Sequence, residues 1–482
     1  MSRRAGLRRV IRRDPDYTVS ATITTPHGNV VADVPCRVYL PRSMRGRPYL
    51  EFDLAEAQKG PLTVAEFSVR AHAEIPNGVI SVRSDIVITQ GWSEESWGAK
   101  FIRCTMPGEP WDLEVTIGGI ASDDDVIQNG TFWLTPNRLL NPSLMSLFSP
   151  TGAVEMTTAR ELAFELPDAL VHFRRHFHHE QKKSAVLRTS ELVAEINDKL
   201  ERAGLDHFVN ELDDILLLTS LATRHRCVCR GWRVAVANCE TLFYRNRLAV
   251  PKDRKISVQE TLIDDPEFND FLKHAFATFR QNDGREALRQ AIDLLVSSQE
   301  GTIEASFLKC FAALETLVTL YRQSAGLGTI LDPQSWATFE KDFKSFIKGH
   351  ALFKEDSARR NLVYQKREEL NRVAFGTVYR KCTESLGKYG FHDDDLWPVV
   401  GSSRGLSLAE IRNRIVHGVV FTPPQQEALF KSLIHLRWCV ERMVLAFLEW
   451  PIERSLVGRF LGHLATYHTW KAAQELLSRD AA

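Results

Sequence analysis

The sequence has no long hydrophobic run, few cysteines and no excess of charge of either sign. Its longest apolar runs, such as ILLLTSLA at residues 215–222, are much shorter than the roughly 20 residues of a membrane-spanning helix. Eight cysteines spread over 482 residues are too few for a disulfide scaffold, and the N-terminal residues lack the apolar core of a signal peptide. These absences predict a cytoplasmic protein with reduced thiols and no membrane contact.

The chain also lacks the glycine-rich motifs that hold nucleotide phosphates. It has no GxxxxGK loop and no GxGxxG turn after a strand, so nucleotide hydrolysis is disfavoured. Sixty-one basic residues balance sixty-one acidic ones, so a nucleic-acid partner would need a local basic surface. What the sequence does have is a hydrophobic content of 44%, which is enough for two or three packed domains.

The first part of the chain has the pattern of strands. Runs rich in Val, Ile and Thr, among them YTVSATITT, EFSVRAHAEI and WDLEVTIGGI, are separated by turn signals such as PHGN and PNGV. This pattern extends from residue 17 to about residue 133 and predicts a β-rich region. The preceding residues 1–16 are rich in arginine, and this predicted basic arm either binds RNA backbone or remains a solvated tail.

The next part mixes helical and strand patterns. Residues 168–183, DALVHFRRHFHHEQKK, and residues 190–204, SELVAEINDKLERAG, have apolar spacings that favour helices. A third stretch, LDDILLLTSLATRHRCVCRGWRVAVANCE, combines a helix with a strand. Residues 17–245 are therefore predicted to form one β-rich domain of mixed structure.

Beyond residue 245 the strand signal fades. Residues 246–284 are predicted to be a helical connector and residues 285–482 an all-α domain. Three strongly amphipathic helices mark this domain: REALRQAIDLLVSSQ, TIEASFLKCFAALETLVTLYRQ and PQQEALFKSLIHLRWCVERMVLAFLEW. Residues 324–405 have the composition of an insertion with short helices, because LDPQSW, FHDDDLWP and SSRG interrupt the pattern. The predicted fold class is α+β, with the β-rich domain first and the helical domain second.

One stretch of the helical domain, IRNRIVHG at residues 411–418, places polar groups inside an apolar helical pattern. An arginine with a histidine five positions later is a weak signal by itself, because Arg174 with His179 and Arg202 with His207 match it too. A helical context is therefore needed before this stretch can be interpreted as a site.

The context of Arg412 separates it from those matches. Asn413 follows it directly, and SLAE at residues 407–410 has the spacing of a capping box that starts a helix. We expect this helix to span residues 407–420. Its apolar residues are expected to pack against the rest of the domain: Ile411, Ile415, Val416 and Val419.

Helical geometry limits how the polar trio can act. Asn413 and His417 share one face a single turn apart, whereas Arg412 lies roughly 140° around the helix from His417. Either the long arginine side chain wraps back around the helix, or a second copy related by a two-fold axis supplies the missing partner to each site. A guanidinium binds phosphate oxygens, an imidazole transfers protons near neutral pH, and RNA carries its own 2′-hydroxyl nucleophile. The trio therefore predicts metal-independent cleavage of RNA, and a buried polar network that fixes helix register is the alternative.

Two other groups of residues contain metal-ligand types without a standard spacing. His172 and His176 are one helical turn apart, but two arginines lie between them, which favours a solvated basic face. A second group has ligand types suited to zinc but no paired CxxC knuckles: His225, Cys227, Cys229 and Cys239. The alternation in HRCVCRGWRV favours a strand with two of these cysteines on one face. We therefore predict no metal and no cofactor, with zinc at the second group left open.

The C-terminal region resembles the HEPN (higher eukaryote and prokaryote nucleotide-binding) family, in the Apea-like branch found in bacterial anti-phage defence. Arg412, Asn413 and His417 match the family motif of arginine, polar residue, three spacers and histidine. The similarity extends through FLKCFAALETL, DDLWPVV and IHLRWCVERMVLAFLEW and covers residues 285–475. The N-terminal half is similar, less specifically, to the large N-terminal domain of those proteins through GTFWLTPNRLLNPS.

The resemblance implies an HEPN helical bundle that acts as a metal-independent endoribonuclease, without a cofactor, as a homodimer or higher homo-oligomer. Arg412 would orient the scissile phosphate, His417 would act as general acid or base, and Asn413 would hold the phosphate or the imidazole. Glu315 matches an acidic position of the family and would orient Arg412 or His417. The substrate would be host RNA such as tRNA, cut during abortive infection when the N-terminal domain senses a phage-derived trigger. A non-catalytic dimerisation, RNA-binding or scaffold protein is the alternative.

Overall fold

The structure of the chain is a computed structural model. It describes residues 14–41, 46–55, 66–76, 78–89, 93–97, 100–119, 122–140, 144–149, 152–157, 162–166, 169–182, 185–196, 200–236, 238–248, 261–401, 405–459 and 461–478. Most of the predicted basic arm lies outside these residues. The chain divides into two compact units, the β-rich unit (residues 1–219 and 227–256) and the helical unit (residues 220–226 and 257–482). Strands come first and helices second, so the predicted α+β class is confirmed.

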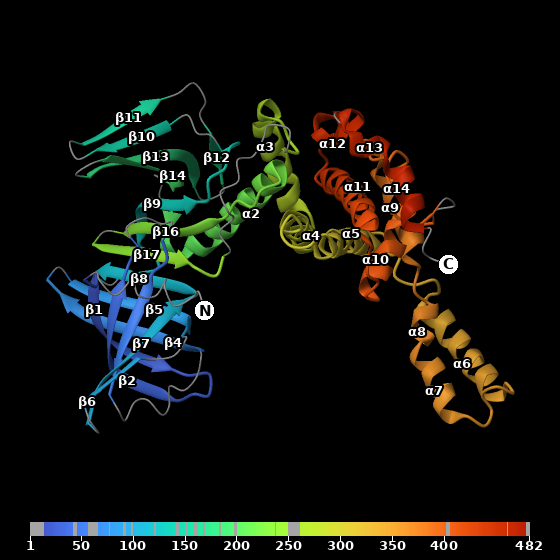
Figure 1. Cartoon of the computed structure of the whole chain (residues 1–482), viewed down its shortest axis with the longest axis horizontal. Helices are drawn as coiled ribbons and strands as arrows, with labels where there is room; N and C mark the ends of the chain where they lie inside the picture. The colour runs from blue at the N-terminus through green and yellow to red at the C-terminus, as the bar shows by residue number, and fades with distance from the viewer. Residues whose placement is uncertain are drawn as a thin grey trace. The chain divides into compact units, whose positions relative to one another are not determined.

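The β-rich unit begins with a closed barrel of six antiparallel strands (Figure 1). Around the barrel the strands are β1 (Tyr17–Thr24), β2 (Val30–Tyr39), β3 (Tyr49–Leu54), β7 (Lys100–Pro110), β5 (Gly78–Ile88) and β4 (Glu66–Ile75), and β4 pairs back with β1. The predicted turn between the first two strands contains Gly28 at a φ of 82°, a left-handed conformation that favours glycine. Closure gives each of these strands a neighbour on both sides.

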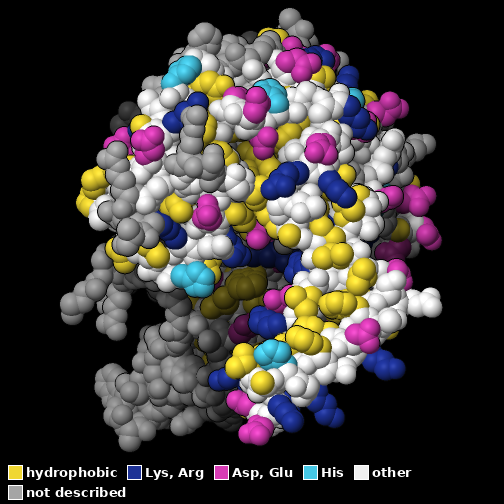
Figure 2. Space-filling view, turned by 90° about the vertical axis from the view of Figure 1, so that its right-hand side faces the viewer, with side chains coloured by type: hydrophobic (Ala, Val, Ile, Leu, Met, Phe, Trp, Pro, Cys, Tyr) yellow, Lys and Arg dark blue, Asp and Glu magenta, His cyan; other side chains and the backbone are white. Residues whose placement is uncertain are grey.

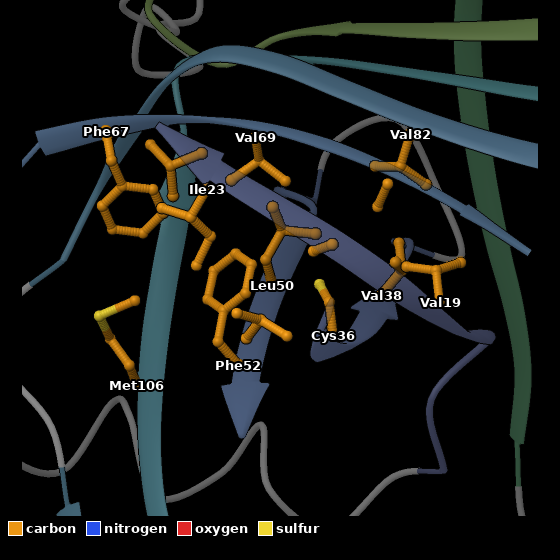
Figure 3. Packing of buried hydrophobic residues seen from close by; sticks show 14 of the residues in the cluster. Val19, Ile23, Cys36, Val38, Leu50, Phe52, Phe67, Val69, Val82 and Met106 are labelled. Carbon is orange, nitrogen blue, oxygen red and sulfur yellow. The ribbon is translucent and has the colours of Figure 1, made fainter. Parts of the chain in front are cut away.

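Alternate residues of the barrel strands fill its interior. On β1 the side chains of Val19, Ala21 and Ile23 are buried, while the residues between them are more exposed. Figure 3 shows Val19 and Ile23 pointing toward residues of the neighbouring strands. The rings of Phe52 and Phe67 meet edge to face there, with 5.5 Å between their centroids. The valine-rich and isoleucine-rich runs of the sequence thus form the barrel core.

The same sheet continues from the barrel through β8 (Asp112–Gly118), which pairs with β5 and with β17 (Cys239–Arg245). Beyond β17 come β16 (Cys229–Val236), β9 (Val126–Leu134), β14 (Ala185–Ile196) and β13 (Leu170–Lys182). Shorter strands complete the unit: β6 (Ser93–Trp97), β10 (Leu144–Ser149), β11 (Gly152–Thr157), β12 (Ala163–Glu165) and β15 (Leu200–Glu201). Helix α2 (Leu205–Thr223) places Phe208 against Phe132 of β9, with 4.9 Å between the ring centroids.

The helices predicted at residues 168–183 and 190–204 are wrong. These segments form β13 and β14, which pair antiparallel along their length, and among their described residues only Arg202–Gly204 makes a short helical turn. Val171 and Phe173 are buried while the residues between them are partly exposed, which is a period of two. The same apolar spacing also fits a helix locally, and pairing with neighbouring strands decides between the two.

The strand geometry also separates the two histidines that a helix would have placed one turn apart. His172 and His176 lie four residues apart on β13, or about 13 Å along an extended strand, which is too far to share a metal ion. The Nε2 atom of His176 lies 2.9 Å from Oε1 of Glu195 on β14. The Nη1 atom of Arg174 lies 3.1 Å from the other oxygen of that carboxylate. These side chains form a half-buried ion-pair cluster rather than a metal site.

The helical unit is a bundle around α5 (Ile303–Ser324) and α11 (Pro423–Phe447) (Figure 1). Against these two helices pack α4 (Arg285–Ser297), α9 (Phe375–Leu386) and α14 (Trp470–Ser478). α10 (Leu408–Val416) packs on α5 and α3 (Asp265–Gln281) on α4, while α12 (Leu456–Arg459) and α13 (Ala465–His468) are short connections. The three predicted amphipathic helices are α4, α5 and α11 and are confirmed. No helix in the described part of the chain has the length and apolar character to cross a bilayer.

The residues between α5 and α9 form a helical hairpin that projects from the bundle (Figure 1). It consists of α6 (Pro333–Gly349), α7 (Ser357–Gln365) and α8 (Arg367–Leu370). Asn371 closes its base, because Oδ1 accepts a hydrogen bond from the Leu331 amide at 2.7 Å and Nδ2 donates to the Leu331 carbonyl at 3.2 Å. Hydrophobic side chains lie exposed between charged ones along this hairpin (Figure 2). α6 is longer than the short helices expected here, and α9 belongs to the bundle.

Candidate active site

Helix α10 carries the candidate trio and has a well-anchored start. The predicted capping box is confirmed, since Ser407 Oγ accepts from the Glu410 amide at 3.4 Å and Glu410 Oε2 accepts from the Ser407 amide at 2.7 Å. The next two amides, of Leu408 and Ala409, donate to the carbonyl oxygens of Pro398 and Val399 at 2.9 and 3.1 Å. The DDLWPVV segment therefore fixes where α10 begins.

The end of α10 comes earlier than the sequence pattern predicts. The helix stops at Val416 rather than residue 420, with His417 as its C-cap and Gly418 at a φ of 75°. The Gly418 amide donates to Ile415 O and the Val419 amide to Arg414 O, both at 3.0 Å, which is a Schellman motif. The apolar pattern continues past Val416 and so does not indicate where the helix ends. Gly418 does indicate the end, because glycine adopts this left-handed conformation without strain.

The trio lies at the surface in contact with an acidic side chain of α5. Nη1 of Arg412 donates to Oδ1 of Asn413 at 3.2 Å, and Nη2 lies 3.8 Å from Oε1 of Glu315. The side chains of Arg412 and Glu315 are 35% and 44% exposed, so this ion pair is weak and leaves the guanidinium accessible. His417 is exposed one turn from Asn413, and its amide donates to the Asn413 carbonyl at 2.9 Å. Among the described residues its imidazole has no hydrogen-bond partner.

The apolar residues beside the trio differ from the prediction. Ile411 is fully buried and Ile415 partly buried, as expected for packing against the bundle. Val416 and Val419, which were also expected to pack, are 54% and 45% exposed, and Val420 is 89% exposed. Within one chain these three valines form an uncovered apolar strip next to the polar trio.

A buried ion pair supports the segment that holds α10. Arg442 of α11 is almost fully buried, and its Nη1 and Nη2 donate to the two oxygens of Asp395 at 2.7 and 2.8 Å. Burial alone would raise the pKa of Asp395, but the hydrogen bonds and charge of Arg442 lower it below its ordinary value. Arg442 also donates to the carbonyl oxygens of His392 and Val457. Two of the sequence segments that carry the HEPN resemblance are thus joined in the core.

A buried histidine completes this support. His435 of α11 accepts at Nδ1 from the Trp397 amide at 3.3 Å, so its Nε2 donates to the Thr466 carbonyl at 3.2 Å. Burial lowers the pKa of His435 to about 4, and the imidazole is neutral near neutral pH. Trp397 in turn donates from Nε1 to the Leu406 carbonyl at 2.8 Å, one residue before the cap of α10. His435 therefore stabilises α10 indirectly, through its hydrogen bond to Trp397.

Two arginines that the sequence patterns do not single out, Arg322 and Arg372, interact near the C-terminal end of α5. Arg322 is about two turns from Glu315, on the same face of the helix. Burial and the neighbouring charge of Arg372 lower the pKa of Arg322. Its Nη2 donates to the Val373 carbonyl at 3.3 Å, and its shielded Nε has no partner among the described residues. Two adjacent guanidinium groups without an acidic partner there are suited to an anion such as RNA phosphate.

The cysteines considered for zinc are packed in the β-rich unit. Cys227 Sγ donates to the Thr135 carbonyl at 3.8 Å and Cys229 Sγ to the Gly231 carbonyl at 3.4 Å. Both are fully buried on one face, as the strand alternation predicts, and burial raises the pKa of each thiol to about 12. No cluster of three or more His, Cys, Asp or Glu residues in the described ranges is arranged to hold a metal ion. The packing of these cysteines is that of a strand core.

Comparison of the chain with protein-family models, with curated proteins and with solved structures finds no match.

Proposed function

We propose that this chain is a metal-independent endoribonuclease of the HEPN type, in the Apea-like branch, that acts as a homodimer. One observation carries the proposal. Arg412, Asn413 and Glu315 lie in contact at an exposed turn, with His417 beside them at the end of the same helix. The alternative, a buried polar network that fixes the register between packed helices, would instead enclose these side chains.

The proposed reaction uses the 2′-hydroxyl of RNA as nucleophile. The guanidinium of Arg412 binds the non-bridging phosphate oxygens and stabilises the negative charge that develops on them. The 2′-oxygen bonds to phosphorus as the bond from phosphorus to the 5′-oxygen breaks. His417 accepts the 2′-hydroxyl proton or donates one to the leaving 5′-oxygen. The products are a 2′,3′-cyclic phosphate and a free 5′-hydroxyl.

A second copy of the chain would complete the site. Arg412 and His417 point roughly 140° apart around α10, so one chain does not direct both at the same phosphate. Val416, Val419 and Val420 form an exposed apolar strip beside them, which a two-fold contact between α10 helices would cover. Such a contact places two arginines and two histidines around one cleft.

The anti-phage role and the host substrate come from the resemblance. Cleavage of host RNA, with tRNA as the substrate to test first, would arrest infected cells. The β-rich unit would sense a phage-derived trigger or restrain the nuclease until infection.

The test is cleavage of tRNA by the purified chain in excess chelator, compared with Arg412→Ala and His417→Ala. We expect each variant to lose at least about 100-fold in rate, which is typical for removal of a general acid or base or of a phosphate-stabilising group. Arg359→Ala is the matched control, because this exposed arginine of α7 pairs with Asp356 of the same hairpin. Cyclic phosphate ends on the products would support the mechanism. Equal cleavage by all four proteins, or cleavage that needs added Mg²⁺, would contradict it. Dimers that bind RNA without cutting it would favour the scaffold alternative.

A further inference from the structure

A cavity of about 880 Å³ opens at one end of the barrel in the β-rich unit. It lies where β2 ends, β3 begins, and β5 and β7 end, and the residues after β17 form one of its walls. Ligand sites in proteins have volumes of roughly 300–1,000 Å³, so this one can hold a small molecule of nucleotide size.

Aromatic rings line the cavity. Tyr39 and Tyr49 lie side by side across β2 and β3, with 5.9 Å between their ring centroids and their planes tilted by 51°. Trp111, which follows β7, leaves 42% of its surface exposed although it is among the largest apolar side chains of the unit. Tyr39 is only 8% exposed, so the accessible ring faces are those of Trp111 and Tyr49, and accessible ring faces in a concave site favour stacking with a flat ligand.

Hydrogen bonds hold the backbone of the cavity wall around Trp111 in place before any ligand binds. The Trp111 amide donates to the Ile86 carbonyl at 2.9 Å, and the Trp111 carbonyl accepts from the Arg247 amide at the same distance. Nδ2 of Asn246 donates to the Pro110 carbonyl at 2.8 Å. Because its backbone is held on both sides, Trp111 loses little conformational freedom when a ligand stacks on it.

Two guanidinium groups and one carboxylate line the same cavity. Arg47 is exposed and has no acidic partner among the described residues. Nε of Arg247 lies 3.4 Å from Oδ2 of Asp112, in a pair whose arginine is 57% exposed, so its outer N–H groups remain accessible. Glu109 is the opposing charge. A cavity with stacking surfaces and two accessible arginines matches a ligand with a flat ring and an anionic group.

We propose that this cavity binds a nucleoside monophosphate, with the base stacked on Trp111 and Tyr49 and the phosphate held by Arg47 and Arg247. This proposal does not depend on the nuclease, because every residue involved belongs to the β-rich unit. Burial raises the pKa of Tyr39, so its hydroxyl stays protonated and can donate a hydrogen bond to the ligand.

Isothermal titration of the full chain tests the proposal, with adenosine 5′-monophosphate as the probe. Adenosine alone and inorganic phosphate alone are the two half-ligands. We expect the monophosphate to bind at least about tenfold more tightly than either half, because a charge-assisted hydrogen bond and a stacked base each contribute that much. Binding by inorganic phosphate alone, or no binding of the monophosphate at millimolar concentration, would overturn the proposal.

Substitutions of residues that line the cavity test whether the monophosphate binds there. Arg47→Gln and Trp111→Ala should each weaken binding of the monophosphate about tenfold or more, and Trp111→Phe should retain most of it. Arg83→Gln is the control, since this exposed arginine of the same unit pairs with Asp85 away from the cavity. Unchanged affinity in both test variants would place the ligand elsewhere. Binding of a proline-rich peptide, lost in Trp111→Ala, without any nucleotide binding would identify a peptide groove instead.

Discussion

Acidification should destabilise the helical unit through one buried histidine. The neutral His435 accepts a hydrogen bond at Nδ1 from the Trp397 amide, and adding a proton there removes that acceptor inside the core. The folded pKa of about 4 lies below the ordinary value of about 6.5, so the unfolded chain binds the proton more readily. The stability that depends on His435 is therefore complete above about pH 6.5 and is lost as the pH falls toward 4.

The size of the effect follows from the two pKa values. With about 4 in the folded state and about 6.5 in the unfolded state, protonation should cost about 2.5 kcal/mol at about pH 4.5. We would measure this as the free energy of urea unfolding of the helical unit, from circular dichroism at about 222 nm, at about pH 7.5 and pH 4.5. Carboxylates elsewhere also titrate in this range, so the comparison is made between variants.

The His435→Gln variant has no titratable side chain at this position. Its free energy of unfolding should therefore fall by about 2.5 kcal/mol less than that of the unaltered chain between the two pH values. At neutral pH the variant should already be less stable by about 1–3 kcal/mol, because Trp397 or Thr466 loses a buried hydrogen-bond partner. His417→Gln is the control, since it replaces an exposed histidine by the same residue and leaves the buried hydrogen bonds of His435 in place. Equal losses in His435→Gln and the unaltered chain would refute the reasoning.

Three further predictions concern the ion pair, the apolar strip and the arginine pair. Arg442→Met leaves the Asp395 carboxylate without its partner in the core and should cost about 3–5 kcal/mol of unfolding free energy; a loss below about 1 kcal/mol would contradict this. Val420→Asp should shift the chain toward monomers in analytical ultracentrifugation without lowering its melting temperature, because this side chain is 89% exposed; an unchanged dimer would exclude α10 from the contact. Replacing both Arg322 and Arg372 by Gln should reduce the slope of RNA affinity against salt by about 1 to 2, and an unchanged slope would place the RNA backbone elsewhere.

The helical half was more predictable from the sequence than the strand half. α4, α5 and α11 have an apolar stripe over several turns, and a period of 3.6 sustained over that length is typical of a helix and not of a strand. β13 and β14 carry apolar patterns that fit both periods. Their strand state depends on neighbours that are distant in sequence, such as the pairing of β14 with β9.

The candidate site was predictable only in part, for a similar reason. The capping box of Ser407 and Glu410 is local, and the sequence contains all of it. The approach of Glu315 to Arg412 was expected only through the family resemblance, since almost a hundred residues separate them along the chain. The neighbouring Arg322 and Arg372 belong to opposite sides of the hairpin, so no local pattern joins them. Tertiary packing alone brings such pairs together.

Closure of the barrel has a consequence during synthesis of the chain. β3 and β5 have β2 and β4 as neighbours on one side, and the barrel closes only when β7 pairs with β3 and with the end of β5; β7 ends at Pro110. Until the ribosome has released that strand, the nascent chain presents two unpaired strand edges, of which β5 is rich in valine and isoleucine and β3 carries the apolar Leu50, Phe52 and Leu54, and such edges favour aggregation. A fragment that stops before residue 100 would keep those edges open permanently, whereas one that extends beyond the last barrel strand can close the ring.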